Sequence, residues 1–251
     1  MPACSPIIDS TLIIHRGASA YAPENTLQSL ALAADMGSSW VESDVRLTAD
    51  DQLIMLHDDD VRRTTDGAGQ AALLPLDAIG KLDAGGWFSP RYRGCSVPTL
   101  SQYLTMTQER QLGLVLELKH VHGWEEKLVR LVAAEITATW RDSPEKLVIS
   151  AFSERCLKTA KILLPNHPRC LAVTAIPELP AQRLSDVNAT MLHLQHSYAG
   201  PEGLARLREA EMEFAFATVN NPQRARHLLK NGATSIMTDK PDLLDKGAGH
   251  V

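Results

Sequence analysis

Hydrophobic and polar positions alternate along this chain with two different periods. Short apolar runs, which are typical of buried strands, begin near residues 12, 40, 113, 147, 170, 190, 213 and 234. Between them lie longer stretches in which apolar residues recur at every third or fourth position, the pattern of a helix with one buried face. The alternation therefore predicts eight strands, each followed by a helix.

Turn residues refine the limits of these elements. We expect a first helix that begins near Pro23, because proline is favoured at the first helical position, with Glu24 in its first turn and Gly37 at its end. A last helical turn is expected after Pro241. The other predicted helices are 99–110, 123–140, 153–164, 177–186, 201–211 and 221–231, and the predicted strands are 12–15, 40–47, 113–118, 147–151, 170–174, 190–195, 213–219 and 234–238.

One region departs from the alternation. A turn-rich tetrad at residues 48–51 joins strand 40–47 to a further extended run at 53–57, which predicts a hairpin. Residues 58–98 are then rich in Asp, Gly and Pro and contain no clear long element. A loop of this length inside a compact domain is usually functional. We expect an insertion, in which Trp87 and Phe88 form either a small satellite core or an apolar lid.

The number and order of the units indicate the fold class. Eight strand–helix units in 251 residues match the size of a (β/α)8 TIM barrel. The alternative is a doubly wound open sheet, which usually carries a glycine-rich loop after its first strand. Here Gly17 follows His15 and Arg16, and no GxGxxG motif is present. We therefore predict one barrel domain over residues 1–251, with a small insertion after strand two.

Composition narrows the classes of function. Apolar residues make up 44% of the chain, as expected of a globular protein. The 25 basic and 30 acidic residues give a net charge of −5, which argues against a nucleic-acid partner. The same charge mildly repels anionic substrates, so a phosphate site would need a metal or a few well-placed cations.

The sequence also bears on the cellular location of the protein and on the state of its cysteines. Residues 1–10 lack a basic segment followed by an apolar run, and no apolar run approaches the roughly 20 residues of a membrane helix. We expect a cytoplasmic protein without stable membrane insertion. The four cysteines show no metal-binding spacing and are predicted to be free thiols.

Polar residues concentrate where the predicted strands end. The carboxyl ends of the strands form the catalytic face of a TIM barrel, and unpaired charges are too costly for a barrel interior. This concentration therefore indicates a ligand or metal. The strand-end residues are His15, Arg16, Glu42, Asp44, His57, Glu117, Lys119, Ser150, Gln195, Asn220 and Asp239.

Three of these residues are candidate metal ligands. Glu42 and Asp44 are two positions apart on one strand, so both point to the same face about 7 Å apart. Glu117 ends the next barrel strand. Each carboxylate alone is consistent with a solvated surface group, but three at one mouth repel each other unless a cation lies among them. Oxygen ligands favour one divalent cation, Mg²⁺ or Ca²⁺.

Histidines and cations supply the other candidate chemistry. A single histidine at a strand end is usually structural, but His15 and His57 flank the acidic strand and could form an acid/base pair. Arg16 and Lys119 offer a planar fork and a point charge for a phosphate, although both could also pair with the carboxylates. His193 and His196 are interpreted as structural or peripheral.

These residues form a series of motifs that resembles the glycerophosphodiester phosphodiesterase family, in particular its compact cytoplasmic bacterial enzymes. The resemblance runs from about Leu12 to Leu244 and keeps the order of the family's motifs. The motifs are His15-Arg16-Gly17, Pro23-Glu24-Asn25-Thr26, Glu42-Ser43-Asp44, Leu56-His57-Asp58, Glu117-Leu118-Lys119, Thr218-Val219-Asn220 and Met237-Thr238-Asp239.

The resemblance implies a TIM barrel with an insertion after strand two. It also implies hydrolysis of small-molecule glycerophosphodiesters to sn-glycerol 3-phosphate and an alcohol. The resemblance implies that Glu42, Asp44 and Glu117 bind the metal and that His15 and His57 are the acid/base pair. It implies that Arg16 and Lys119 bind phosphate, and that Glu24 fixes Arg16 or contacts the site. One departure is Ala217, where the family often carries Trp.

The sequence is also compatible with two alternative functions. A lysophospholipase D on the same barrel would need an apolar groove for an acyl chain, and the insertion is mostly polar. A non-catalytic binding barrel should have lost a histidine or a metal carboxylate, and this chain keeps both histidines and all three carboxylates. The attacking group could be water or the 2-hydroxyl of the substrate, and a homo-oligomer is possible.

Overall fold

A computed structural model describes residues 6–245 of the chain. Within this range nine strands form one sheet, and eight of them are parallel to their barrel neighbours. The strands are β1 (Leu12–His15), β2 (Trp40–Leu47), β3 (Leu53–Met55), β4 (Gly113–Leu118), β5 (Leu147–Ala151), β6 (Arg169–Val173), β7 (Met191–Gln195), β8 (Glu213–Ala217) and β9 (Ser235–Thr238).

The sheet closes into a barrel because β1 pairs with both β9 and β2. Ile14 lies opposite Thr238 on one side and Val41 on the other. The remaining strands follow in the order β2, β4, β5, β6, β7, β8, β9 around the barrel. The predicted (β/α)8 TIM barrel is confirmed, and the open sheet is excluded.

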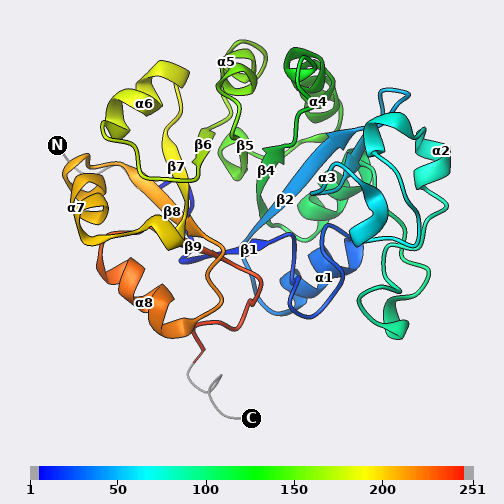
Figure 1. Ribbon diagram of the computed structural model, residues 1–251, viewed down its shortest axis with the longest axis horizontal. Helices are drawn as coiled ribbons and strands as arrows, with labels where there is room; N and C mark the ends of the chain where they lie inside the picture. The colour runs from blue at the N-terminus through cyan, green and yellow to red at the C-terminus, as the bar shows by residue number, and fades with distance from the viewer. Residues whose placement is uncertain (1–5, 246–251) are drawn as a thin grey trace.

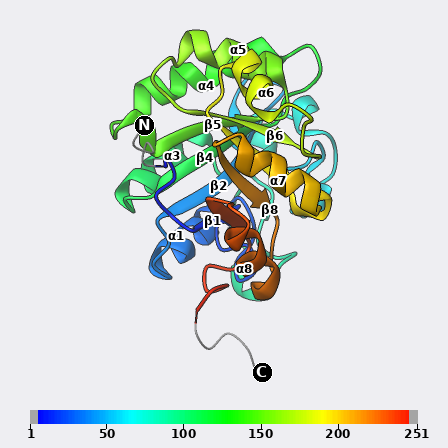
Figure 2. The same cartoon turned by 90° about the vertical axis from the view of Figure 1, so that its left-hand side faces the viewer.

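Helices surround this barrel on the outside (Figures 1 and 2). In the described range six of them directly follow barrel strands, whereas short α2 lies in the segment after β3 and α3 ends that segment. The helices are α1 (Leu27–Asp35), α2 (Leu76–Ile79), α3 (Leu100–Glu109), α4 (Glu125–Thr139), α5 (Glu154–Leu163), α6 (Pro180–Val187), α7 (Pro201–Glu209) and α8 (Pro222–Lys230). Most limits lie within one to three residues of the predicted ones. After β9 the chain forms a turn at residues 241–244, where a last helical turn was expected after Pro241.

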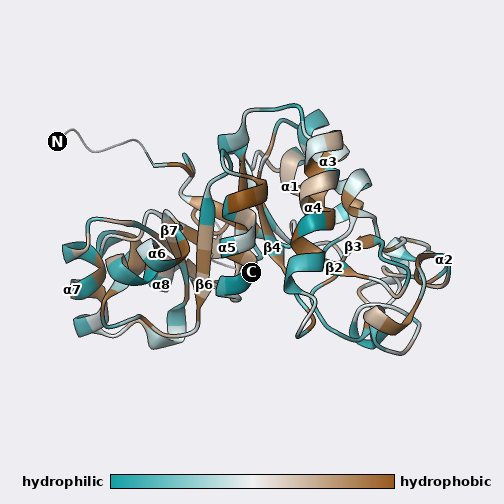
Figure 3. Cartoon of the chain, turned by 90° about the horizontal axis from the view of Figure 1, so that it is seen from above, coloured by the Kyte–Doolittle hydropathy of each residue, from teal (hydrophilic) through white to brown (hydrophobic). Residues whose placement is uncertain are grey.

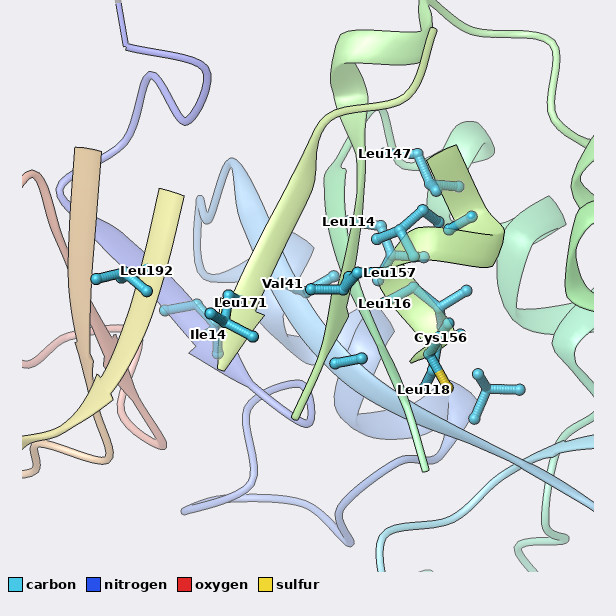
Figure 4. Packing of buried hydrophobic residues seen from close by; sticks show 14 of the residues in the cluster. Ile14, Val41, Leu114, Leu116, Leu118, Leu147, Cys156, Leu157, Leu171 and Leu192 are labelled. Carbon is cyan, nitrogen blue, oxygen red and sulfur yellow. The ribbon is translucent and has the colours of Figure 1, made fainter. Parts of the chain in front are cut away.

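Apolar side chains lie on both faces of the barrel wall. The outward set packs against the helices, as Figure 4 shows for Leu114, Leu116 and Leu118 of β4 beside Leu157 of α5. The inward set takes one residue from each barrel strand and fills the lower interior. Its members from the strands are Ile13, Trp40, Val115, Val148, Cys170, Met191, Ala215 and Met237. Strand periodicity of two places these residues on the inner face.

The start of the first helix differs from the prediction. Thr26, not Pro23, is the N-cap of α1: its hydroxyl accepts a hydrogen bond from the Ser29 backbone N–H at 3.2 Å, and the Ser29 hydroxyl bonds back to the Thr26 N–H. This reciprocal capping satisfies two backbone donors at the start of α1, and the left-handed backbone of Asn25 prevents a helix from running through it from Pro23. Glu24 therefore lies in the loop at the barrel mouth and not in the helix.

The hairpin and the segment after it extend the molecule to one side. β3 runs antiparallel to the end of β2, with Val45 opposite Met55, as predicted. The chain between β3 and α3 contains only short helical turns, which pack on a small apolar cluster that includes Ile54 and Ile79. Figures 1 and 3 place this part of the chain on the side opposite α6 and α7.

None of the helices in residues 6–245 is long and apolar enough to cross a membrane.

Candidate active site

The layer above the apolar barrel interior carries the candidate chemistry. Because strand side chains alternate, the residue two positions after each inward apolar residue also points inward, one layer nearer the mouth. Ionisable residues dominate this layer on β9, β1, β2 and β4, whereas β5, β6 and β8 contribute Ser or Ala. The layer consists of His15, Glu42, Glu117, Ser150, Ala172, His193, Ala217 and Asp239.

Three carboxylates meet on the polar side of this layer. Glu42, Asp44 and Glu117 each place one oxygen within 4.8 Å of the others, and Glu42 and Asp44 are only 1% exposed. Glu42 lies in the first half of β2, and not late in the strand as predicted, because β2 continues beyond the barrel to pair with β3. Adjacent strands β2 and β4 bring Glu117 to the other two residues.

Cations contact this cluster unevenly. Arg16 Nε and Lys119 Nζ each lie 3.3 Å from a different oxygen of Asp44. Burial opposes the charged form of Asp44, but the two cations outweigh it and hold the pKa of Asp44 well below its usual range. Lys119 also forms an ion pair with Glu117. In the described residues, the ion-pair contact of Glu42 is with His15, whose Nε2 lies 3.9 Å from Glu42 Oε2.

The electrostatics of Glu42 test whether a metal ion fits this cluster. Burial, followed by repulsion from Asp44 and Glu117, raises the pKa of Glu42 well above its ordinary value. Burial and Asp44 also raise the pKa of Glu117. A divalent cation among the three carboxylates would remove both the desolvation cost and the repulsion. The donors are all oxygens, so the residues present fit Mg²⁺ or Ca²⁺.

His15 is oriented by a carboxylate from the last strand. Its Nδ1 lies 2.7 Å from Oδ1 of Asp239, which also accepts a hydrogen bond from the Ser19 hydroxyl at 3.0 Å. Asn220 donates a hydrogen bond to the other oxygen of Asp239. Burial alone would raise the pKa of Asp239, but the bond to His15 lowers it to about 2. With Nδ1 occupied, His15 Nε2 faces the carboxylate cluster.

His57 has a parallel arrangement. Its Nδ1 lies 2.6 Å from Oδ1 of the neighbouring Asp58, and its backbone carbonyl accepts a hydrogen bond from Arg46 Nε at 2.9 Å. Burial lowers the pKa of His57, and the charge of Asp44 opposes this shift. A neutral imidazole held at Nδ1 has its Nε2 available for proton transfer. In both candidate histidines, therefore, an aspartate binds Nδ1 and leaves Nε2 as the nitrogen available for catalysis.

A cavity of about 310 Å³ opens at the mouth beside these groups. One wall carries both histidines, Glu117 and Lys119. Small or apolar residues, among them Ala172, Ala217 and Met237, line other parts of the cavity together with His193. The cavity therefore leaves space for a bound molecule next to the ionisable groups.

Comparison with known proteins shows which family this chain belongs to. A model of the glycerophosphoryl diester phosphodiesterase family matches residues 15–243. The chain belongs to that family. The glycerophosphodiester phosphodiesterase of Bacillus subtilis is 31% identical over 255 aligned residues, which cover 93% of this chain and 85% of that one. The corresponding enzyme of Caldanaerobacter subterraneus is 29% identical, with coverage of 93% and 96%.

Solved structures of similar proteins support the same family assignment. A phosphodiesterase from Oleispira antarctica, in complex with the product sn-glycerol-3-phosphate, matches with a TM-score of 0.89 and 34% identity, covering 92% of this chain and 94% of that chain. A glycerophosphodiester phosphodiesterase from Agrobacterium tumefaciens matches with a TM-score of 0.76 and 28% identity, covering 93% and 98%. The prediction that this chain is a phosphodiesterase of the family is confirmed.

The structure of this glycerophosphoryl diester phosphodiesterase brings all eight predicted site residues to one mouth. Glu24 Oε1 accepts a hydrogen bond from Arg16 Nη1 at 2.8 Å. His193 lies in the cavity wall with 6% of its surface exposed, and burial lowers its pKa to about 4. Trp87 and Phe88 contact each other but do not line this cavity, so neither covers the candidate site as a lid.

Sequence reasoning gave no role to several residues that hold the site together. Asn25 adopts the left-handed conformation and donates a hydrogen bond to Asp44 Oδ2 at 2.8 Å. Asp58 and Asp239 orient the two histidines. Arg63 contacts both Glu24 and Asp58. An Asx residue before a helix cap, and an aspartate directly after a histidine, are signals that could have drawn attention to Asn25 and Asp58.

Proposed function

We propose that this enzyme hydrolyses glycerophosphodiesters to sn-glycerol 3-phosphate and an alcohol, with one divalent cation held by Glu42, Asp44 and Glu117. The observation that carries the proposal is the meeting of these three carboxylates within 4.8 Å at the mouth that also holds two aspartate-oriented histidines. When bound, Mg²⁺ or Ca²⁺ supplies Lewis-acid polarisation and neutralises charge on the phosphoryl oxygens.

Arg16 and Lys119 are the proposed phosphate-binding groups. Both are partly buried at the cavity, with 15% and 14% of their side chains exposed, and both lie against Asp44. Burial opposes their charged forms, but neighbouring carboxylates, Asp44 foremost, raise the pKa of each above its ordinary value. Both side chains are therefore positively charged at neutral pH. Glu24 holds the Arg16 guanidinium in place through a 2.8 Å hydrogen bond.

His15 and His57 are the proposed acid/base pair. Each presents its Nε2 away from the aspartate that binds Nδ1, so one histidine can take a proton from the attacking group while the other protonates the leaving alkoxide. The attacking group is either water or the glycerol 2-hydroxyl, and the second route passes through a cyclic phosphate. Detection of a cyclic glycerophosphate during a single turnover would identify the second route.

The test is release of sn-glycerol 3-phosphate from a panel of glycerophosphodiesters, measured with a coupled enzyme assay. We expect release that stops after exhaustive chelation and returns on addition of Mg²⁺ or Ca²⁺. Full activity after chelation would refute the metal site, and absence of release from every head group would refute the substrate class. A lysophosphatidylcholine arm tests the lysophospholipase D alternative.

A further inference from the structure

Arg63 lies outside the cavity but next to the groups that line it. It ends a short 3₁₀ turn, Val61–Arg63, whose first free backbone N–H is capped by the Asp60 side chain. This turn belongs to the irregular segment after β3, and not to the barrel. The Arg63 side chain is 44% exposed, so its partners alone hold it in position.

The guanidinium makes two pairs of hydrogen bonds. Toward Glu24, Nη1 donates to Oε2 at 2.7 Å and Nη2 donates to Oε1 at 2.8 Å. Toward Asp58, Nε donates to Oδ2 at 2.6 Å and Nη2 donates to Oδ1 at 2.9 Å. One planar group therefore joins two carboxylates that are 34 positions apart in the sequence.

Each of these two carboxylates also binds a residue of the candidate site. The oxygen of Glu24 that accepts from Arg63 Nη2 also accepts from Arg16 Nη1, at 2.8 Å in both cases. The oxygen of Asp58 that accepts from Arg63 Nη2 lies 2.6 Å from His57 Nδ1. Arg63 is thus one residue removed from a proposed phosphate-binding group and from a proposed acid/base group.

The chemistry of arginine explains why this residue can connect both sides. Its five N–H donors lie in one rigid plane and serve two carboxylates at once, whereas a lysine offers one compact ammonium group. Hydrogen bonds from Arg63 also hold the pKa of Asp58 well below its usual range, so that Asp58 stays ionised beside His57.

We propose that Arg63 is a positioning residue that fixes Arg16 through Glu24 and His57 through Asp58, and so couples the segment after β3 to the barrel site. The inference rests on the proposed roles of Arg16 and His57. Without Arg63, the two carboxylates repel each other across the gap, and both site residues lose one side of their support. Phosphate binding and proton transfer then weaken together.

The experiment measures sn-glycerol 3-phosphate release from glycerophosphocholine for wild type, Arg63→Met, Arg63→Lys and the control Arg62→Met. Arg62 occupies the same turn and its side chain is 73% exposed; within residues 6–245 its one ion-pair contact is with Asp60, at 4.0 Å. We expect Arg63→Met to lower kcat/KM about 10- to 100-fold, with a higher KM and a lower kcat. Arg63→Lys should recover only part of this loss, and Arg62→Met should stay within about twofold of wild type.

Two further measurements separate positioning from folding. Added guanidinium should restore part of the activity of Arg63→Gly, because the ion can occupy the place of the missing group. In an Asp58→Asn background, Arg63→Met should cost less than it does in wild type, because residues that act through one another are not additive. The guanidinium rescue uses a different variant, so it stays informative if Arg63→Met itself folds poorly.

The outcomes are distinct. Failure of wild type to release product refutes the proposed function and, with it, the inference, which rests on the proposed roles of Arg16 and His57. An active wild type with Arg63→Met equal to Arg62→Met overturns the inference. So does a loss that follows only the melting temperature, without rescue by guanidinium and with full additivity in the Asp58→Asn background.

Discussion

Replacement of Glu42 by Gln should have opposite effects on stability with and without metal. The change keeps the shape of the side chain and removes one charge from a group that is 1% exposed. In the metal-free protein, Glu42 has two carboxylate neighbours within 4.8 Å. At that separation a like-charge pair costs about 3.5 kcal/mol for an effective dielectric constant of about 20.

Arg16 and Lys119 already offset much of this repulsion, so the net relief is smaller. We expect metal-free Glu42→Gln to gain about 1–2 kcal/mol in free energy of unfolding, or roughly 2–8 °C in melting temperature for a chain of this size. In the presence of metal the order of stability reverses, and wild type becomes the more stable protein. At a free metal concentration 100 times its Kd, wild type gains about 2.7 kcal/mol, and the variant, which lacks one ligand, gains much less.

The assay is thermal unfolding of both proteins in chelator and at increasing Mg²⁺ and Ca²⁺, with calorimetric titration of the metals. Glu109→Gln is the control, since Glu109 is exposed at the end of α3 and should change little in either condition. A variant that is less stable than wild type in chelator would contradict the repulsion argument. Equal metal affinities for the two proteins would contradict the assignment of Glu42 as a ligand.

Three further outcomes are expected. His15→Ala and His57→Ala should each lower kcat about 10²- to 10⁴-fold in the coupled assay, and near-full turnover of both would remove them from acid/base roles. Thr26→Ala removes the cap of α1 and should cost about 1 kcal/mol, seen as a fall in melting temperature of roughly 2–4 °C. His193 has a pKa of about 4 because it is buried, whereas an unfolded histidine titrates near 6.5. Between pH 6.5 and pH 4, therefore, His193 is protonated in the unfolded chain but neutral in the folded protein. Wild type should lose about 3 kcal/mol in free energy of unfolding as the pH falls through this range. His193→Gln should lose less over the same range, and equal acid sensitivity of the two proteins in denaturant titrations would contradict the buried neutral state.

The local pattern of the chain was sufficient to predict the barrel and much of the site. Apolar runs and helical stretches have periods that depend only on backbone geometry, so the order of strands and helices could be counted. The period of two also placed Glu42 and Asp44 on one face before any tertiary contact was known. At the start of α1 the sequence pattern favoured Pro23, and the reciprocal hydrogen bonds of the Thr26 cap place the start four residues later.

Only the tertiary structure decided which residues support the site. Asp239 reaches His15 across 224 positions because β9 pairs with β1 when the barrel closes. Arg63 reaches Glu24 because the irregular segment after β3 folds back onto the loop that follows β1, and such a segment has no periodicity from which its path could be predicted. The sequence by itself determined the repeating elements and the chemistry at their ends, since both depend on neighbours along the chain. The partners that orient this chemistry depend on strand pairing and loop packing, which bring together residues far apart in the sequence.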